Sequence, residues 1–177
     1  MNKKSAGILL YRFENSNFEV FLVHPGGPFF IKKDLGAWSI PKGEFNEGED
    51  PLETAKREFH EETGSQIEGD FMELSPVTQK GGKTVFAWAL KGNINPNEIK
   101  SNTFELEWPP KSNKKKSFPE IDKGEWFNVQ TAKQKINQNQ ASLIDELCNK
   151  LGLTEKQIKG EIRQSTMESK NSQLDLF

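Results

Sequence analysis

The chain contains little cysteine and little histidine, which limits the chemistry open to it. Its 177 residues include one cysteine and two histidines. The single thiol, Cys148, cannot form an intramolecular disulfide, and the neighbouring Leu147 and Leu151 indicate a helix core position in a protein of a reducing compartment. The only histidines, His24 and His60, support neither a zinc site nor a histidine-based triad. The catalytic candidates must therefore be sought among other residue types.

The chain also lacks a long apolar run and an excess of one charge. No stretch approaches the roughly 18 apolar residues of a membrane span. The N-terminal sequence has no signal-peptide cleavage region, so we expect a cytoplasmic protein. The 24 basic and 26 acidic side chains leave a net charge of −2. We therefore expect no membrane association and no direct binding to nucleic acid.

The length suits one domain with a C-terminal extension. We expect a domain over residues 1–152, followed at 153–177 by a short helix and a flexible tail. Apolar runs bounded by turn residues predict strands at 4–13, 18–24, 37–41, 71–80, 83–91 and 101–108. An apolar stripe at helical spacing predicts a helix at 141–151, and the lysine-rich segment 110–120 is predicted to be a mobile loop.

The stretch from Gly43 to Ser65 carries the strongest local signals. Asp50 is a natural helix N-cap, Pro51 suits the first helical position, and Glu53 completes a capping box. Gly64 provides a C-terminal stop. These signals predict a helix between Asp50 and Gly64.

One face of this predicted helix is acidic. Glu58, Glu61 and Glu62 have i, i+3 and i+4 spacing, so all three project from one side, beside an apolar face that includes Ala55 and Phe59. Like charges on one face destabilise a helix, whereas a divalent cation would remove the repulsion and Mg²⁺ prefers oxygen ligands. The spacing alone leaves a solvated acidic face and a metal site as alternatives.

The same segment resembles the Nudix box, whose pattern is Gly-x5-Glu-x7-Arg-Glu-hydrophobic-x-Glu-Glu-x-Gly-hydrophobic. The matching residues are Gly43, Glu49, Arg57, Glu58, Phe59, Glu61, Glu62 and Gly64. Only the last position departs from the pattern, because Ser65 replaces a hydrophobic residue. The resemblance implies an α/β fold: a Nudix-like α/β/α sandwich with a mixed β-sheet and a catalytic helix.

The resemblance also implies roles for individual residues. Glu58 and Glu62 would be the leading ligands of Mg²⁺ or Mn²⁺, and Glu61 would be a third ligand or the general base. Arg57 would orient the glutamates. In the family, the backbone carbonyl before the box glycine often joins the metal shell, and the matching residue here is Lys42.

A further glutamate is expected from a loop. In family members that prevent mutations, a loop glutamate lies shortly before a Glu-Trp pair and joins the metal site or acts as the base. Glu120, which precedes Glu125 and Trp126, matches this arrangement. Glu105 and Glu107 compete for the role from a neighbouring strand. The sequence leaves open whether Glu61, Glu105, Glu107 or Glu120 is the general base.

Two loops offer candidate substrate contacts. Lys114, Lys115 and Lys116 are candidates for binding phosphates, and a solvated tether is the alternative. Phe30 lies in a loop rich in proline and glycine and is a candidate for stacking on a base, as aromatic side chains do with unpaired bases. The alternative is a loop anchored by its own aromatic residues.

The C-terminal sequence QLDLF places apolar side chains at the end of a polar tail. Its residues are Gln173, Leu174, Asp175, Leu176 and Phe177. This sequence resembles the peptide by which many bacterial replication and repair proteins bind the DNA sliding clamp, which would then be a partner. The alternative is that the apolar side chains fold back on the protein or join a dimer.

Taken together, the resemblance implies a metal-dependent pyrophosphohydrolase that cleaves a phosphoanhydride bond in nucleoside or dinucleoside polyphosphates. The sequences Ser5-Ala6-Gly7 and Pro41-Lys42-Gly43 look most like members acting on dinucleoside polyphosphates, whereas a clamp peptide would favour cleansing of damaged nucleoside triphosphates. The alternatives are a nucleotide-sensing module that does not hydrolyse, an adaptor recruited to the clamp, and an activity on nucleic-acid ends.

Overall fold

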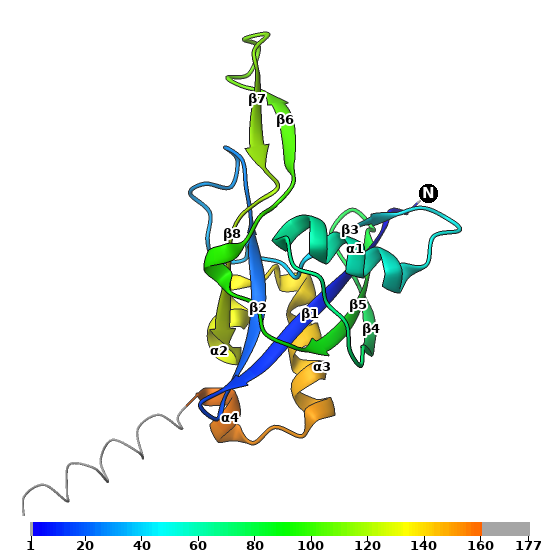
Figure 1. The fold of residues 1–177 in the computed structure, drawn as a ribbon, viewed down its shortest axis with the longest axis vertical. Helices are drawn as coiled ribbons and strands as arrows, with labels where there is room; N and C mark the ends of the chain where they lie inside the picture. Colours follow the sequence, from blue (N-terminus) through cyan, green and yellow to red (C-terminus); the bar gives the residue numbers. More distant parts are fainter. Residues whose placement is uncertain (1, 161–177) are drawn as a thin grey trace, which may run out of the picture.

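A computed structural model describes residues 2–160, which form one mixed sheet, helices on both of its faces and a projecting hairpin (Figure 1). The sheet contains β1 (Lys4–Glu14), β2 (Asn17–Pro25), β3 (Lys42–Phe45), β4 (Met72–Thr78), β5 (Thr84–Lys91) and β8 (Ile121–Asn128). Its order is β4-β5-β1-β2-β8, with β3 also pairing with β1. β1 and β5 are parallel and the other pairs are antiparallel. The predicted clamp peptide lies outside the described residues.

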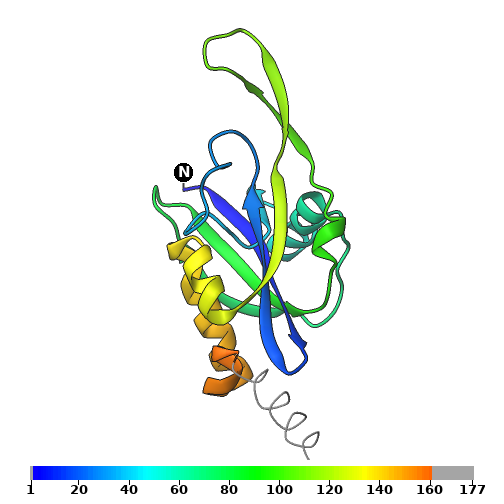
Figure 2. The same cartoon turned by 90° about the vertical axis from the view of Figure 1, so that its left-hand side faces the viewer.

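The helices cover both faces of the sheet. They are α1 (Pro51–Thr63), α2 (Val129–Lys135), α3 (Ala141–Leu151) and α4 (Glu155–Lys159), with short 3₁₀ turns at η1 (Pro96–Glu98) and η2 (Gln138–Gln140). Figure 2 shows α2 and α3 on the left of the sheet and α1 on the right. No helix formed by residues 2–160 is long and apolar enough to cross a membrane.

Successive side chains of β1 point to opposite faces of the sheet and so contribute to both halves of the core. Ile8 and Leu10 pack with Phe59 of α1, whereas Leu9 belongs to the cluster that contains Leu147 of α3. This follows from the strand period of two, which sends successive side chains to opposite faces. The predicted α/β/α sandwich with a mixed sheet is confirmed.

The third strand lies later in the chain than predicted. The sequence predicted a strand at 37–41, but β3 begins at Lys42, and Trp38 and Ser39 make only isolated bridges. Pro41 has no backbone N–H to donate to a ladder, although its carbonyl accepts from the N–H of Ile8 at 3.0 Å. The segment before β3 therefore remains irregular and lines a pocket.

A second correction concerns the lysine-rich segment. β6 (Thr103–Glu107) pairs with β7 (Lys115–Pro119) in a separate two-stranded sheet that projects beyond the rest of the fold in both views (Figures 1 and 2). The sequence predicted the first strand and a loop in place of the second. Phe104 and Phe118 lie opposite each other with ring centroids 6.0 Å apart. This cross-strand aromatic pair stabilises a strand in a segment whose charges indicated a loop.

Candidate active site

Helix α1 begins and ends as its sequence predicts. The side chain of Asp50 accepts a hydrogen bond from the N–H of Glu53 at 2.9 Å. Gly64 ends the helix with φ 80°, a left-handed conformation that glycine adopts without strain. Ala55 and Phe59 are fully buried against the sheet. The carboxylate face of α1 is therefore fixed beside that apolar face.

Glu58 lies against the backbone of β3. A Cβ added at Gly43 would lie 1.9 Å from the carboxyl carbon of Glu58, so only glycine leaves room for this carboxylate. The Glu58 side chain is 12% exposed. Burial, followed by repulsion from Glu61, raises the pKa of Glu58. Gly43 thus has a steric role in placing an acidic side chain at the sheet edge.

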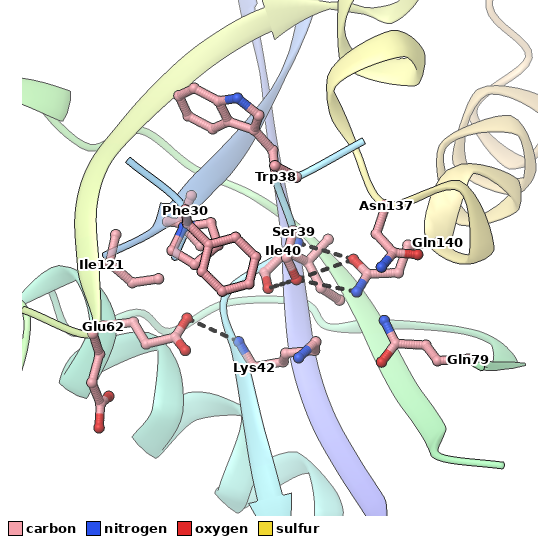
Figure 3. A pocket seen from close by; sticks show the side chains of 14 residues that line it. Phe30, Trp38, Ser39, Ile40, Lys42, Glu62, Gln79, Ile121, Asn137 and Gln140 are labelled. Atoms are coloured by element: carbon pink, nitrogen blue, oxygen red, sulfur yellow. Dashed lines mark hydrogen bonds between the residues drawn. The ribbon is translucent and has the colours of Figure 1, made fainter. Parts of the chain in front are cut away.

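Glu62 makes a second contact with the same strand. Its Oε2 accepts a hydrogen bond from the backbone N–H of Lys42 at 3.1 Å (Figure 3). Burial raises the pKa of Glu62 to about 8. Burial, followed by repulsion from Lys83, lowers the pKa of the Lys42 ammonium. Glu62 and Lys42 are thus buried where their charged forms are poorly hydrated. A further cation would stabilise the ionised carboxylate of Glu62.

Arg57 contacts two of the three helix glutamates. Its Nη1 lies 3.0 Å from Oε1 of Glu58 and 3.0 Å from Oε1 of Glu61. Glu53, the other acidic residue one turn away, pairs with Lys56 at 3.5 Å. Arg57 thus bridges two of the helix glutamates, and its orienting role stays a prediction.

Glu120 is brought to α1 by the backbone around it. Its N–H donates to the carbonyl of Asn102 and its carbonyl accepts from Gly26, each at 2.8 Å, while the N–H of Asn102 donates to the carbonyl of Glu61 at 2.9 Å. Burial, followed by repulsion from Glu61, raises the pKa of Glu120. These bonds place Glu120 within the electrostatic range of Glu61, and its role in the site stays a prediction.

Glu62 and Glu120 border a pocket of about 310 Å³ that also contains Lys42 and Phe30. Glu62 and Phe30 lie on one side of it in Figure 3, and three amide side chains lie on the other. Those amides belong to Gln79, Asn137 and Gln140. The pocket thus combines carboxylates, an aromatic ring and hydrogen-bonding groups.

The amide side chains are functional candidates that the sequence reading missed. Gln140 is fully buried, and its Oε1 accepts from the backbone N–H of Ile40 at 3.1 Å while its Nε2 donates to Ser39 at 3.1 Å. Asn137 caps η2 by accepting from the N–H of Asn139 at 3.0 Å, so its amide nitrogen remains a potential donor. No local pattern indicated these residues, because they meet only in the fold.

The loop that carries Phe30 is fastened to the sheet by His24, which is 2% exposed. Nδ1 of His24 lies 2.8 Å from Oδ1 of Asp122, and its Nε2 lies 2.6 Å from the backbone carbonyl of Lys33. The two ring nitrogens thus connect β8, through Asp122, to the loop at Lys33. His24 thus has a structural role that a search for catalytic histidines does not reveal.

The structure does not bring every predicted site residue to the pocket. The pocket lining contains none of the lysines Lys114, Lys115 and Lys116, which are exposed on the hairpin segment. Glu105 and Glu107 are also exposed on the hairpin, where Glu105 lies 4.0 Å from Lys115. Glu120 is therefore the loop glutamate that borders the pocket.

The acidic side chains provide suitable oxygen donors for a divalent cation. Burial and mutual repulsion raise the pKa values of Glu58, Glu62 and Glu120, so nearby positive charge would stabilise their ionised forms. Within residues 2–160, however, no three His, Cys, Asp or Glu side chains are already arranged as a metal cluster. Cation binding would therefore require these side chains to move, including release of Glu58 from Arg57.

Comparison with known proteins identifies the family. The model of the NUDIX domain matches residues 1–147 of the chain. The chain therefore belongs to the Nudix family, as the box predicted. Nudix hydrolases generally use divalent metals, and this agrees with the donor set described above.

The chain is similar to several characterised members. It is 33% identical over 100 residues to the mouse asymmetrical bis(5′-nucleosyl)-tetraphosphatase, covering 50% of this chain and 64% of that protein. It is 39% identical over 80 residues to an 8-oxo-(d)GTP phosphatase of Mycolicibacterium smegmatis, covering 41% of this chain and 23% of that protein. The aligned region thus spans less than two thirds of either relative.

A solved structure supports the same fold. A C. elegans Ap4A hydrolase in a binary complex superposes with a TM-score of 0.60 at 23% identity, covering 85% of this chain and 98% of that one. At this identity the likeness concerns the fold alone. The Nudix fold is thus confirmed for the described part of the chain.

The raised pKa of Glu62 predicts a pH-dependent stability of the metal-free protein. The folded-state pKa of about 8 lies above the unfolded value of about 4.3. The resulting stabilisation is present below the unfolded value and is lost as the pH rises through the folded value. In EDTA, urea unfolding should show that Glu62→Gln gains stability relative to the wild type between pH 5.5 and 8.5. Parallel curves for the two proteins would contradict this, and Glu53→Gln, exposed on the same helix, is the control.

His24→Leu should loosen the loop that follows β2, because it removes the hydrogen bond to the Lys33 carbonyl. Loss of a bond worth about 1 kcal/mol corresponds to roughly fivefold faster amide exchange. Hydrogen exchange with mass spectrometry on peptides covering residues 26–36 would measure it. Lys33→Ala is the matched control, because it removes the side chain and keeps the carbonyl. Equal amide exchange in His24→Leu and the wild type would show that His24 does not hold this loop in place.

Proposed function

We propose that this chain is a metal-dependent pyrophosphohydrolase that cleaves a phosphoanhydride bond in nucleoside or dinucleoside polyphosphates. The proposal is carried by the pocket, in which Glu62 and Glu120 lie within one cavity with Phe30 and the amide side chains. Carboxylates serve a divalent cation, whereas an aromatic ring and amides serve a nucleoside. A single nucleotide bound in this cavity would contact both the carboxylates and the nucleoside-binding side chains.

The carboxylates divide into metal ligands and a base. Glu58 and Glu62, with the backbone carbonyl of Lys42, would hold Mg²⁺ or Mn²⁺, and Glu61 is the further candidate ligand once Arg57 releases it. The cation would neutralise charge on the polyphosphate and orient the attacking water. These candidate ligands all lie on α1 or at the start of β3, and the contacts of Glu58 with Gly43 and of Glu62 with Lys42 support the assignment.

Glu120 is our candidate for the general base. It borders the pocket, whereas Glu105 and Glu107 lie on the exposed hairpin and Glu61 is paired with Arg57. Its raised pKa brings proton affinity closer to the value that suits a base at neutral pH. Glu120 would accept the proton of the attacking water as the new bond to phosphorus forms.

The nucleoside half of the ligand would lie between Phe30 and the amides. A base stacked on the Phe30 ring would place its edge toward Asn137 and Gln79, which offer both donors and acceptors. The name of the mouse relative gives a dinucleoside tetraphosphate as the substrate of that protein. Diadenosine tetraphosphate is therefore the first substrate to test here.

The test is mass analysis of products from diadenosine tetraphosphate, nucleoside triphosphates, 8-oxo-dGTP and nucleotide sugars with Mg²⁺ or Mn²⁺. The wild type should cleave at least one phosphoanhydride, and EDTA should abolish this activity. Glu62→Gln should lose about 10² or more of the turnover, since it removes a charged ligand. Glu53→Gln, which lies on the same helix and alters a side chain paired with Lys56, should retain it.

Two results would contradict the proposal. Full turnover by Glu62→Gln would remove α1 from the mechanism. Metal-dependent nucleotide binding by the wild type, without cleavage of any compound, would support the nucleotide-sensing alternative instead.

We also propose that the sequence QLDLF at residues 173–177 binds the DNA sliding clamp. The support is the sequence resemblance, since these residues lie outside the described part of the chain. The intact protein should bind purified bacterial clamp, and a variant that ends at Ser172 should not, as measured by calorimetry. Equal affinities would refute the proposed binding of residues 173–177 to the clamp. The deletion should leave nucleotide hydrolysis unchanged.

A further inference from the structure

The β6–β7 hairpin contributes no residue to the pocket lining, although two lining residues adjoin it. Glu120 directly follows β7 in the chain. Phe30 reaches the pocket from the loop at residues 26–36, which contacts the hairpin through its neighbour Phe29. The hairpin can therefore influence the pocket through these two connections.

Two glycines allow this loop to begin close to the base of the hairpin. A Cβ added at Gly26 would overlap the carbonyl oxygen of Pro119, and one added at Gly27 would lie 3.0 Å from Cζ of Phe104. The N–H of Gly26 donates to the carbonyl of Glu120 at 2.8 Å. Glycine permits this close approach because it has no Cβ. The start of the loop and the backbone of Glu120 are thus fixed to each other at one junction.

The backbone hydrogen bonds of Phe30 stay within the loop. Its N–H donates to the carbonyl of Gly27 at 3.3 Å, and its carbonyl accepts from the N–H of Lys33 at 2.8 Å. The loop is attached to the core further along, where Nε2 of His24 lies 2.6 Å from the carbonyl of Lys33. Between these two attachments, side-chain contacts set the position of the Phe30 ring.

Trp108 makes such a contact from the hairpin. Its ring and the ring of Phe29 meet edge to face, with centroids 5.7 Å apart and an interplanar angle of 85°, which is a preferred geometry for aromatic pairs. The N–H of Trp108 donates to the carbonyl of Lys114 at 2.8 Å, so the hairpin ladder extends to this residue. Alternation puts Trp108 on the same half-buried face as Phe104 and Leu106. The hairpin thus presents Trp108 to the loop.

Phe29 and Phe30 are adjacent in sequence but have different surroundings. Phe29 is 59% exposed and lies outside the pocket lining, where it contacts Trp108. Phe30 is 36% exposed, and its ring lines the pocket (Figure 3). Because the two side chains leave consecutive backbone positions, a rotation that released Phe29 from Trp108 would also move the Phe30 ring. The contact between Phe29 and Trp108 therefore bears on the pocket.

We propose that Trp108 is a positioning residue for the nucleobase, because its contact with Phe29 keeps the Phe30 ring in the pocket. This inference rests on the proposed function, in which a base stacks on Phe30. Trp108 does not line the pocket, so it acts on the ligand through the loop. Glu120 is held by backbone hydrogen bonds of its own. Loss of the Trp108 ring should therefore weaken binding of the base and leave the carboxylates in place.

The test measures binding of a non-hydrolysable ATP analogue, in which methylene groups replace the oxygens between the phosphorus atoms, by calorimetry with Mg²⁺. Trp108→Leu should weaken binding by about twofold to tenfold, the range expected for loss of one aromatic pair. Trp108→Phe keeps an aromatic ring on the hairpin and should retain most of the affinity. Ser117→Ala, which alters the exposed face of β7, should bind the analogue as the wild type does.

Two further variants test the route of the effect. Phe29→Leu removes the other ring of the same pair and should reproduce the loss seen in Trp108→Leu. In a Phe30→Leu background, Trp108→Leu should cause no further loss, because residues that act through one contact are not additive. Circular dichroism and the urea midpoint check the folding of every variant, and Phe29→Leu alters a side chain at the surface.

Kinetics separate this role from a general loss of structure. With the nucleotide that the wild type cleaves, Trp108→Leu should raise KM by the same factor as the loss of affinity and leave kcat unchanged. This follows because the contacts to the base are the same in the bound substrate and in the transition state.

The positioning role is overturned if the wild type does not bind the analogue, if Trp108→Leu binds it as tightly as the wild type, or if Trp108→Leu weakens binding equally with and without the Phe30 ring. A fall in kcat with an unchanged KM would also overturn it. Hydrolysis by the wild type, together with unchanged binding by Trp108→Leu, would retain the proposed function and remove this inference. Trp108-dependent binding without hydrolysis of any compound would do the reverse.

Discussion

The contact between α1 and the start of β3 determines the rest of the site. Glu58 fits against Gly43 because that residue has no side chain, and Glu62 accepts a hydrogen bond from the backbone of Lys42. Both carboxylates are thereby largely withdrawn from water, and Glu62 also lines the pocket. Their raised pKa values follow from this burial. A cation would stabilise carboxylates placed in this way, so the contact that docks the helix also suits the proposed metal site.

Outside this contact, the molecule consists of a sandwich core and of two segments that lie beyond it, the loop at 26–36 and the β6–β7 hairpin. The sandwich core is closed on both faces of the sheet, and α1 is part of it. The loop at 26–36 is joined to the core by bonds of His24, Gly36 and Asp34, and the hairpin is joined to it through the backbone of Glu120. Such segments can change in sequence without disturbing the core. This arrangement suits a family whose members act on different nucleotides with one set of carboxylates.

The sequence predicted α1, α3 and most of the strands because their signals are local, but it indicated no helix at α2. The caps at Asp50 and Gly64 and the stripe of α3 each depend on neighbours within two turns of helix. The strand at 37–41 was misplaced because Pro41 interrupts a ladder that apolar composition favoured. The lysine-rich segment was predicted as a loop because its charges are typical of one. Its pairing with β6 depends on Phe104, which lies fourteen residues before Phe118 in the chain.

By itself, the sequence determined the family and the acidic face of α1, since the spacing of Glu58, Glu61 and Glu62 fixes their direction on any helix. The tertiary structure decided which other groups share the pocket. Gln140 reaches the backbone of Ile40 across one hundred residues of chain, and Phe30 arrives from a loop with no periodic signal. The physical reason is that helical period and capping act over a few residues, whereas a pocket is assembled by strand pairing and packing between distant segments.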